Sequence, residues 1–250
     1  MQANAIFEGG GVKAIGILGA LYEAERRGYT WVNVAGTSAG AIIASLTAAG
    51  YTADEIKQLI WSLDFNRFRD KDWLDRIPYV GLALSLWFEG GLYEGDYLEE
   101  WVRKLLEAKG IRTFKDLVLK EYESDPLCRH RLVVIASDVS RRKLLRLPCD
   151  LEGYGLNPDD LEVSKAVRMS ATLPFFYEPY LLHYPGDGKE KLFSYIVDGG
   201  VLSNFPVWLF DGEGEPQRPT FGFKIIEPDE SAPSKITNAF GLFKAILSTM

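Results

Sequence analysis

Two short stretches of the sequence carry residue types that together could perform acyl transfer at a serine. Gly9, Gly10 and Gly11 stand in a row after an apolar run, and residues 36–40 read Gly-Thr-Ser-Ala-Gly around Ser38. A row of glycines leaves backbone N–H groups unobstructed, and such donors stabilise the oxyanion that forms during acyl transfer. A serine on a tight strand-to-helix turn presents its hydroxyl to a cleft. The sequence therefore predicts a nucleophilic serine that forms an acyl-serine intermediate.

The surroundings of Ser38 favour this interpretation. An apolar strand-like run over 31–35 leads in, and an apolar helix-like run over 39–49 leads out. Gly36 and Gly40 flank the serine at positions where Cβ atoms would clash in a strained turn. The N-terminus of the following helix also favours the negative charge that develops during the reaction.

A serine nucleophile needs a base, and the chain offers few candidates. His130 and His183 are its two histidines, and neither follows Asp198, where an α/β-hydrolase would carry its catalytic histidine. Either could act only through an unusual topology, so we expect structural or solvated roles for both. Asp198 ends a strand-like run, and Gly199 and Gly200 leave room beside it. We favour Asp198 as the base, with a simple Asp-Gly turn as the alternative.

A glycine triplet after a strand could also hold a nucleotide phosphate. Residues 9–14 satisfy the loose dinucleotide-binding pattern, with Ala14 in the last place. That site needs a carboxylate at the end of the second strand, and residues 34–36 read Val-Ala-Gly. The acyl-transfer interpretation is therefore preferred, and a purely structural glycine turn is the remaining alternative.

Alternating strand-like and helix-like segments must position these residues. The opening order of strand, helix, strand, helix implies a parallel sheet with crossover helices. Gly16 and Gly19 are expected to let the first helix approach the sheet closely, and the second helix is apolar nearly all round and should be buried. Strands are predicted over 3–7, 31–35, 131–136, 143–147, 192–197 and 220–226, and helices over 12–27, 39–49, 54–63, 96–109 and 160–169.

We predict one domain over 1–250, with an α/β fold of three layers, α/β/α, around a central, mostly parallel sheet. The strand over 143–147 should pair antiparallel with the one before it. Residues 64–95 are irregular and aromatic, and form either a cap over the active site or ordinary core. Helical spacing returns over 231–250, and the chain stops without a capping residue, from which we expect the natural chain to extend further.

Composition narrows the class of partner and the compartment. The formal net charge of -7 argues against nucleic acid, whose phosphates need a basic surface. Cys128 and Cys149 lack the spacing of a zinc or redox site. No apolar run reaches the roughly 18 residues of a membrane span, and the N-terminus lacks a signal-peptide pattern. We expect a cytoplasmic protein with transient contact at membrane surfaces.

The order of four motifs resembles the patatin-like phospholipases. They are Gly-Gly-Gly-x-Lys at 9–13, Gly-Thr-Ser-Ala-Gly at 36–40, Ser-Ala-Thr-Leu-Pro-Phe-Phe-Tyr-Glu-Pro at 170–179 and Asp-Gly-Gly-Val-Leu-Ser-Asn-Phe-Pro-Val at 198–207. The similarity runs from about residue 4 to about residue 226 and so covers most of the chain. The resemblance implies the patatin-like fold and a Ser-Asp dyad that works without histidine.

By this resemblance Ser38 is the nucleophile and Asp198 the base. The oxyanion hole falls on Gly10 and Gly11, with Gly9 and Lys13 beside them. Three positions depart from the usual pattern: Glu8 replaces aspartate, Lys13 replaces arginine and Ala14 replaces glycine. Lysine keeps a cation near the anion site but lacks the directional fork of a guanidinium group.

The resemblance further implies a lipid acyl hydrolase, of the phospholipase A or lysophospholipase type, that cleaves a fatty acyl ester or phospholipid. No metal or cofactor is required. An acyltransferase or thioesterase with the same dyad is one alternative, and a non-catalytic lipid-binding regulatory protein is another. A group of basic side chains could touch anionic headgroups, although a solvated hairpin is the preferred interpretation: Arg129, Arg131, Arg141, Arg142, Lys143 and Arg146.

Overall fold

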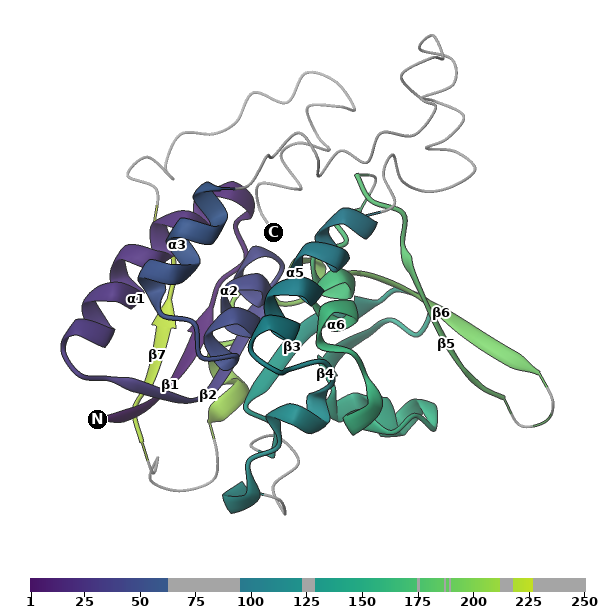
Figure 1. Ribbon diagram of the computed structural model, residues 1–250. Helices are drawn as coiled ribbons and strands as arrows, with labels where there is room; N and C mark the ends of the chain where they lie inside the picture. Colours follow the sequence, from purple (N-terminus) through teal and green to yellow (C-terminus); the bar gives the residue numbers. More distant parts are fainter. Residues whose placement is uncertain are drawn as a thin grey trace, which may run out of the picture.

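The computed structural model contains one seven-stranded sheet with helices packed against it (Figure 1). It describes residues 1–62, 95–122, 129–174, 176–186, 188, 190–211 and 218–226. The predicted cap over 64–95, apart from Gly95, and the predicted helix over 231–250 lie outside these residues, as does Cys128.

Four strands of the sheet run parallel. β1 (Gln2–Phe7) pairs with β2 (Thr30–Thr37) on one side and with β7 (Thr220–Phe223) on the other. β2 in turn pairs with β3 (Leu132–Asp138). β1, β2 and β3 are largely apolar and buried, as expected for parallel strands at the centre of a sheet, whereas β7 lies at the edge and is more exposed.

The two halves of the sheet meet on β3. Residues 134–135 of β3 pair with both β2 and β4 (Lys143–Leu147), and residues 136–138 pair with both β4 and β6 (Lys191–Asp198). A strand has only two edges, so β2 and β6 must share one edge of β3. Because β2 is parallel and β6 antiparallel to β3, their C-terminal ends point toward each other along that edge.

β5 (Tyr180–Pro185) extends the sheet as an antiparallel hairpin with β6 (Figure 1). No strand is predicted around His183 from the sequence, although side chains of this segment alternate between buried and exposed. Leu182 and Tyr184 pack into the main core, whereas Leu181 and His183 face outward. An exposed leucine and a terminal proline obscure this two-residue period in the sequence.

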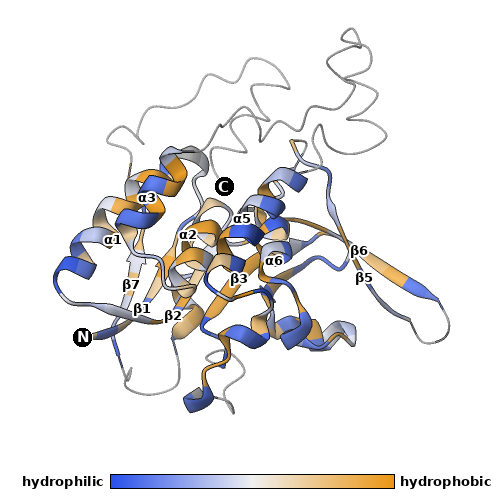
Figure 2. Cartoon of the chain, in the orientation of Figure 1, coloured by the Kyte–Doolittle hydropathy of each residue, from blue (hydrophilic) through white to orange (hydrophobic). Residues whose placement is uncertain are grey.

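Helices cover one face of the sheet (Figure 1), and all of them contribute to the larger hydrophobic cluster. They are α1 (Ile17–Arg26), α2 (Ala39–Ala48), α3 (Ala53–Trp61), α5 (Asp96–Ala108) and α6 (Val163–Ser170). α2 lies innermost, with eight of its residues buried, and is predominantly apolar in Figure 2. This confirms the prediction of a buried second helix.

A smaller apolar cluster covers part of the other face. Leu209 of the 3-10 helix η9 (Val207–Phe210) packs there against side chains of the central strands. The α/β class and the antiparallel pairing of the strand over 143–147 are therefore confirmed, and the complete sheet is mixed. No helix among the described residues combines the length and the apolarity needed to cross a bilayer.

Several predicted boundaries shift in the structure. The first predicted helix opens as the 3-10 helix η1 (Gly11–Gly16) before α1 begins at Ile17. α6 begins at Val163, because residues before it form the separate 3-10 turn η7 (Pro158–Asp160). Gly19 does not contact the sheet: it is exposed, and a Cβ atom there would meet nothing within 4 Å.

Candidate active site

Ser38 stands on a sharp turn between β2 and α2. Its φ of 53° and ψ of -123° are uncommon for a residue other than glycine. A Cβ atom on Gly36 would lie 2.2 Å from the carbonyl oxygen of Gly40, and one on Gly40 would lie 2.3 Å from the carbonyl oxygen of Phe7. Because backbone atoms cannot turn aside as side chains do, both positions require glycine. The expected steric constraint on this turn is therefore present.

Asp198 lies next to Ser38. The Ser38 hydroxyl donates a hydrogen bond of 2.6 Å to Oδ2 of Asp198, and the Gly200 N–H donates one of 2.8 Å to Oδ1. Asp198 ends β6 as predicted, but β6 runs antiparallel to β3 and so does not belong to the parallel part of the sheet. On β3, Ile135 pairs with Thr37 of β2, and the next residue, Ala136, pairs with Asp198 of β6. This register brings Asp198 beside Ser38, which follows Thr37.

Burial changes the acidity of this carboxyl group. The Asp198 side chain is almost completely enclosed, with 1% of the residue exposed. Desolvation raises its pKa from the ordinary value of 3.8 to about 6, although the hydrogen bonds from Ser38 and Gly200 act in the opposite direction. A carboxylate with this pKa is a stronger base than an exposed aspartate and is still largely ionised at neutral pH.

The glycine triplet lies beside the serine. A Cβ atom on Gly9 would be 3.2 Å from Cβ of Ser38. The Gly9 N–H donates to the Asn204 carbonyl oxygen at 3.1 Å, and the Asn204 amide donates back to the Gly9 carbonyl oxygen at 3.2 Å. Gly9 therefore has no N–H to offer to an oxyanion. Within the described residues, the N–H groups of Gly10 and Gly11 donate no hydrogen bond.

Two of the positions that depart from the family pattern flank the triplet. Glu8 accepts a hydrogen bond of 3.1 Å from the Ile225 N–H and lies 3.6 Å from the Lys224 ammonium group, so it ties the end of β1 to the segment after β7. Lys13 lies in η1 with an exposed side chain, and its N–H donates to the Gly10 carbonyl oxygen at 3.2 Å. Neither departure disturbs the contact between Ser38 and Asp198.

Two further residues contact the backbone of the pair, and the sequence argument had assigned them no role. The hydroxyl of Ser170 accepts a hydrogen bond of 2.8 Å from the Ser38 N–H, and the Thr172 carbonyl oxygen accepts one of 2.7 Å from the Asp198 N–H. Both belong to the motif over 170–179, whose sequence carried the resemblance without indicating what it contacts.

The histidines lie away from this pair. His130 is buried before the start of β3, where its Nε2 lies 2.8 Å from an Asp159 oxygen. His183 lies on the outward face of β5, beside the ring of Phe193. Neither makes a hydrogen bond to Ser38 or Asp198 among the described residues.

The basic side chains considered for headgroup contact are partly occupied within the chain. Arg129 makes two hydrogen bonds, of 2.9 and 2.8 Å, to Asp159. Arg141 lies over the rings of Tyr154 and Tyr184, at 4.0 and 4.5 Å. Arg131 and Arg146 also bond within the chain, whereas Arg142 on the hairpin turn and Lys143 at the start of β4 are exposed.

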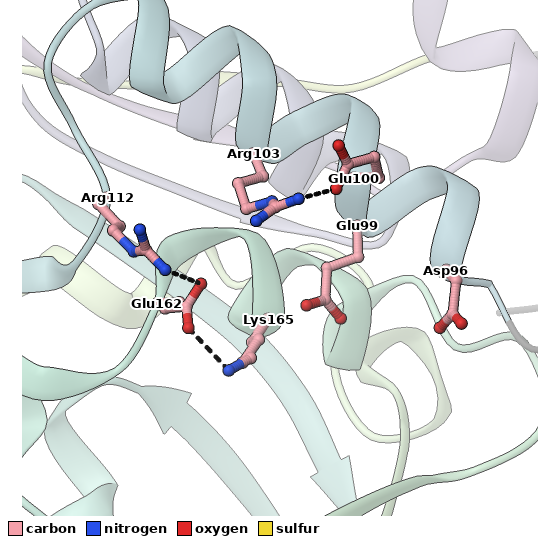
Figure 3. A pocket seen from close by; sticks show the side chains of 7 residues that line it. All are labelled: Asp96, Glu99, Glu100, Arg103, Arg112, Glu162 and Lys165. Atoms are coloured by element: carbon pink, nitrogen blue, oxygen red, sulfur yellow. Dashed lines mark hydrogen bonds and ion pairs between the residues drawn. The ribbon is translucent and has the colours of Figure 1, made fainter.

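A separate pocket opens between α5 and α6 (Figure 3). Its lining includes neither Ser38 nor Asp198, and several of its charged side chains pair with one another, as where Glu162 meets Lys165 at 2.8 Å. The lining residues are Asp96, Glu99, Glu100, Arg103, Arg112, Glu162 and Lys165. In the described part of the chain, no three His, Cys, Asp or Glu side chains gather as a metal ion would need.

Relatives of the chain occur in bacteria and viruses. The chain is 42% identical over 255 residues to the uncharacterized protein YqhO of Bacillus subtilis (strain 168), an alignment that covers 100% of this chain and 80% of YqhO. It is 26% identical over 205 residues to the probable lipid hydrolase 463L of Invertebrate iridescent virus 6, covering 81% of this chain and 61% of that protein.

Among solved structures, VipD from Legionella pneumophila has a similar fold. The match has a TM-score of 0.51 and 20% sequence identity, and it covers 87% of this chain but 48% of VipD. The chain thus spans less than half of VipD, and the likeness concerns the fold alone.

The family model for patatin-like phospholipases matches residues 5–211, which span β1 to the residue after η9. The matched region includes the glycine triplet, the turn at Ser38, the segment from Ser170 and the strand that ends at Asp198. By this match, the chain belongs to the patatin-like phospholipase family.

Proposed function

We propose that this protein is a lipid acyl hydrolase of the phospholipase A or lysophospholipase type, and that Ser38 and Asp198 form its catalytic dyad. The observation that carries the proposal is the 2.6 Å hydrogen bond from the Ser38 hydroxyl to the buried Asp198 carboxylate. Family membership supports the reaction class, and the similarity to 463L, a probable lipid hydrolase, supports the substrate class.

In the first step, Oγ of Ser38 attacks the carbonyl carbon of a fatty acyl ester while Asp198 accepts the hydroxyl proton. The carbonyl electron pair moves to oxygen and gives a tetrahedral oxyanion. When this intermediate collapses, the C–O bond to the alcohol breaks and Asp198 returns the proton to the leaving oxygen. The products are an alcohol, such as a lysophospholipid, and an acyl-serine.

In the second step, water replaces the alcohol. Asp198 accepts a proton from the water molecule as its oxygen attacks the acyl-serine carbonyl carbon. Collapse of the second tetrahedral intermediate breaks the bond to Oγ, and the proton returns to Ser38. The fatty acid leaves, and the dyad regains its starting protonation state.

We assign oxyanion stabilisation to the N–H groups of Gly10 and Gly11. The triplet lies against Ser38, and these two N–H groups have no partner among the described residues. One such donor typically lowers the barrier by about 3 kcal/mol. α2 begins at Ala39, directly after the nucleophile, so its N-terminal dipole adds to the favourable field.

The test is intact-mass measurement after treatment with a fluorophosphonate ester. Wild type should gain one adduct, and Ser38→Ala should gain none. His183→Gln serves as the control, because its side chain lies on the outward face of β5, and it should react as wild type does. Adduct formation by Ser38→Ala, or none by wild type, would contradict the proposed dyad and favour a non-catalytic lipid-binding protein.

A second measurement separates hydrolysis from transfer. Wild type is incubated with phospholipid, lysophospholipid and neutral glyceride vesicles, with and without an added short-chain alcohol, and the products are identified by mass. Free fatty acid as the main product in both conditions supports the hydrolase. Conversion of the product to the ester of the added alcohol would identify an acyltransferase that uses the same acyl-serine.

A further inference from the structure

The end of α6 contacts both members of the proposed dyad through their backbones. Ser170 binds the Ser38 N–H, and Thr172, two residues later, binds the Asp198 N–H. We propose that Ser170 is a positioning residue, whose hydroxyl holds the backbone of Ser38 at the geometry from which Oγ reaches Asp198. This inference rests on the proposed function, since it assigns a role within the same site.

The Ser170 hydroxyl acts both as an acceptor and as a donor of hydrogen bonds. The residue is fully buried, and its Oγ accepts from the Ser38 N–H at 2.8 Å while donating to the Ile135 carbonyl oxygen at 2.5 Å. Ser38 follows the last residue of β2, so its N–H lies outside the strand ladder. The hydroxyl therefore supplies a partner for a donor that the strained turn has left without a backbone acceptor.

The contact between Thr172 and the backbone of Asp198 is also buried. Thr172 is fully buried, and its carbonyl oxygen accepts the Asp198 N–H at 2.7 Å. Its hydroxyl donates to the Arg168 carbonyl oxygen at 2.7 Å and accepts from the Arg168 guanidinium group at 2.5 Å. Arg168 is itself buried and lies 5.3 Å from the Tyr177 ring. These bonds hold Thr172 against the last turn of α6.

The segment over 170–172 therefore binds the backbone at two positions far apart in sequence, Ser38 and Asp198. The separation of Ser38 from Asp198 depends on it, because the hydroxyl and the carboxylate extend from the two backbones that it binds. Without the Ser170 hydroxyl, the N–H of the half-buried Ser38 would lose its hydrogen-bond acceptor, and the turn would move to find another. A displacement of about 1 Å can slow a reaction by about 100-fold.

The chain provides a matched control on the same helix. Ser164 is buried, with 2% exposed, and its hydroxyl has no hydrogen-bond partner among the described residues. Ser164→Ala and Ser170→Ala remove the same atom from the same kind of environment in α6. Only the second removes a contact with Ser38.

The experiment measures the rate constant and the final extent of fluorophosphonate labelling for wild type, Ser170→Ala and Ser164→Ala. We expect Ser170→Ala to react about 10- to 100-fold more slowly and still to reach one adduct per chain. Ser164→Ala should react at the wild-type rate. A wild-type rate for Ser170→Ala overturns the inference, and so does a reduced extent with an unchanged rate constant, since that result indicates lost folded protein.

Hydrogen exchange tests the contact without using the reaction. The Ser38 amide, followed by mass spectrometry of peptides spanning the turn, should exchange at least about tenfold faster in Ser170→Ala and at the wild-type rate in Ser164→Ala. Equal exchange in all three proteins overturns the positioning role. If wild type does not label but this exchange difference is present, the proposed function fails and the structural contact stands.

Discussion

At the scale of single residues, the site depends on an aspartate in an unfavourable environment. Asp198 is enclosed, and its hydrogen-bond donors are one hydroxyl and one backbone N–H. In the described part of the chain no cation offsets its burial, so desolvation dominates and raises the pKa of Asp198 to about 6. In the proposed mechanism, this environment makes the carboxylate a better base for the Ser38 proton, so that no intervening histidine would be needed.

The first prediction concerns the pH dependence of kcat/KM for an uncharged ester. The rate should rise with pH through an apparent midpoint of about 6 and level off above it, because Asp198 acts only as the carboxylate. Asp198→Asn should lower the plateau by about 10²- to 10⁴-fold and remove the rise. A midpoint near the ordinary aspartate value of 3.8 would show that burial does not control the base.

At the scale of elements, the sequence predicted the local geometry well and the pairing less well. The turn at Ser38 could be predicted because glycine spacing and flanking periodicity lie within about a dozen residues. β5 could not, since its period is hidden by Leu181 and Pro185. The contact of Ser170 with Ser38 joins residues 132 positions apart, and local patterns carry no information about such a pairing.

Helical periodicity also left two local questions open. It does not separate a 3-10 turn from an α-helix, so η1 was included in the first predicted helix. It also predicted a close approach of Gly19 to the sheet, which is wrong, whereas the steric requirement predicted for Gly40 from the turn is present. Gly19, which was expected to approach the sheet, faces solvent, whereas Gly40 packs against the end of β1.

This contrast gives a prediction about stability, measured by chemical denaturation. Gly40→Ala should lower the free energy of unfolding by about 2 kcal/mol or more, because its Cβ would meet two carbonyl oxygens, of Phe7 and Glu8, at 2.3 and 2.5 Å. Gly19→Ala should raise it by about 0.5–1 kcal/mol through better helix propensity. Equal effects of the two substitutions would contradict the described approach of α2 to β1.

At the scale of the whole molecule, burial of the ionised Asp198 carboxylate lowers the free energy of unfolding. Each pKa unit corresponds to about 1.36 kcal/mol, so raising the pKa of Asp198 from 3.8 to about 6 corresponds to about 3 kcal/mol. The folded state binds the proton more tightly than the unfolded state. Stability from this group is therefore fully present below pH 4 and is lost as the pH rises through 6.

Asp198→Asn should accordingly be more stable than wild type at pH 8, by up to about 3 kcal/mol, and nearly equal to it at pH 4. Denaturant unfolding of both proteins at the two pH values measures this difference. A pH-independent effect of Asp198→Asn would mean that burial does not disfavour the carboxylate.

The end-to-end placement of β2 and β6 on β3 has a consequence for synthesis on the ribosome. The nucleophile is translated early, but its proposed base arrives 160 residues later and reaches it only by pairing beside β3. A nascent chain that stops before Asp198 therefore holds Ser38 without its proposed base. Under the proposed function, esterase activity would arise only after most of the domain has emerged and folded.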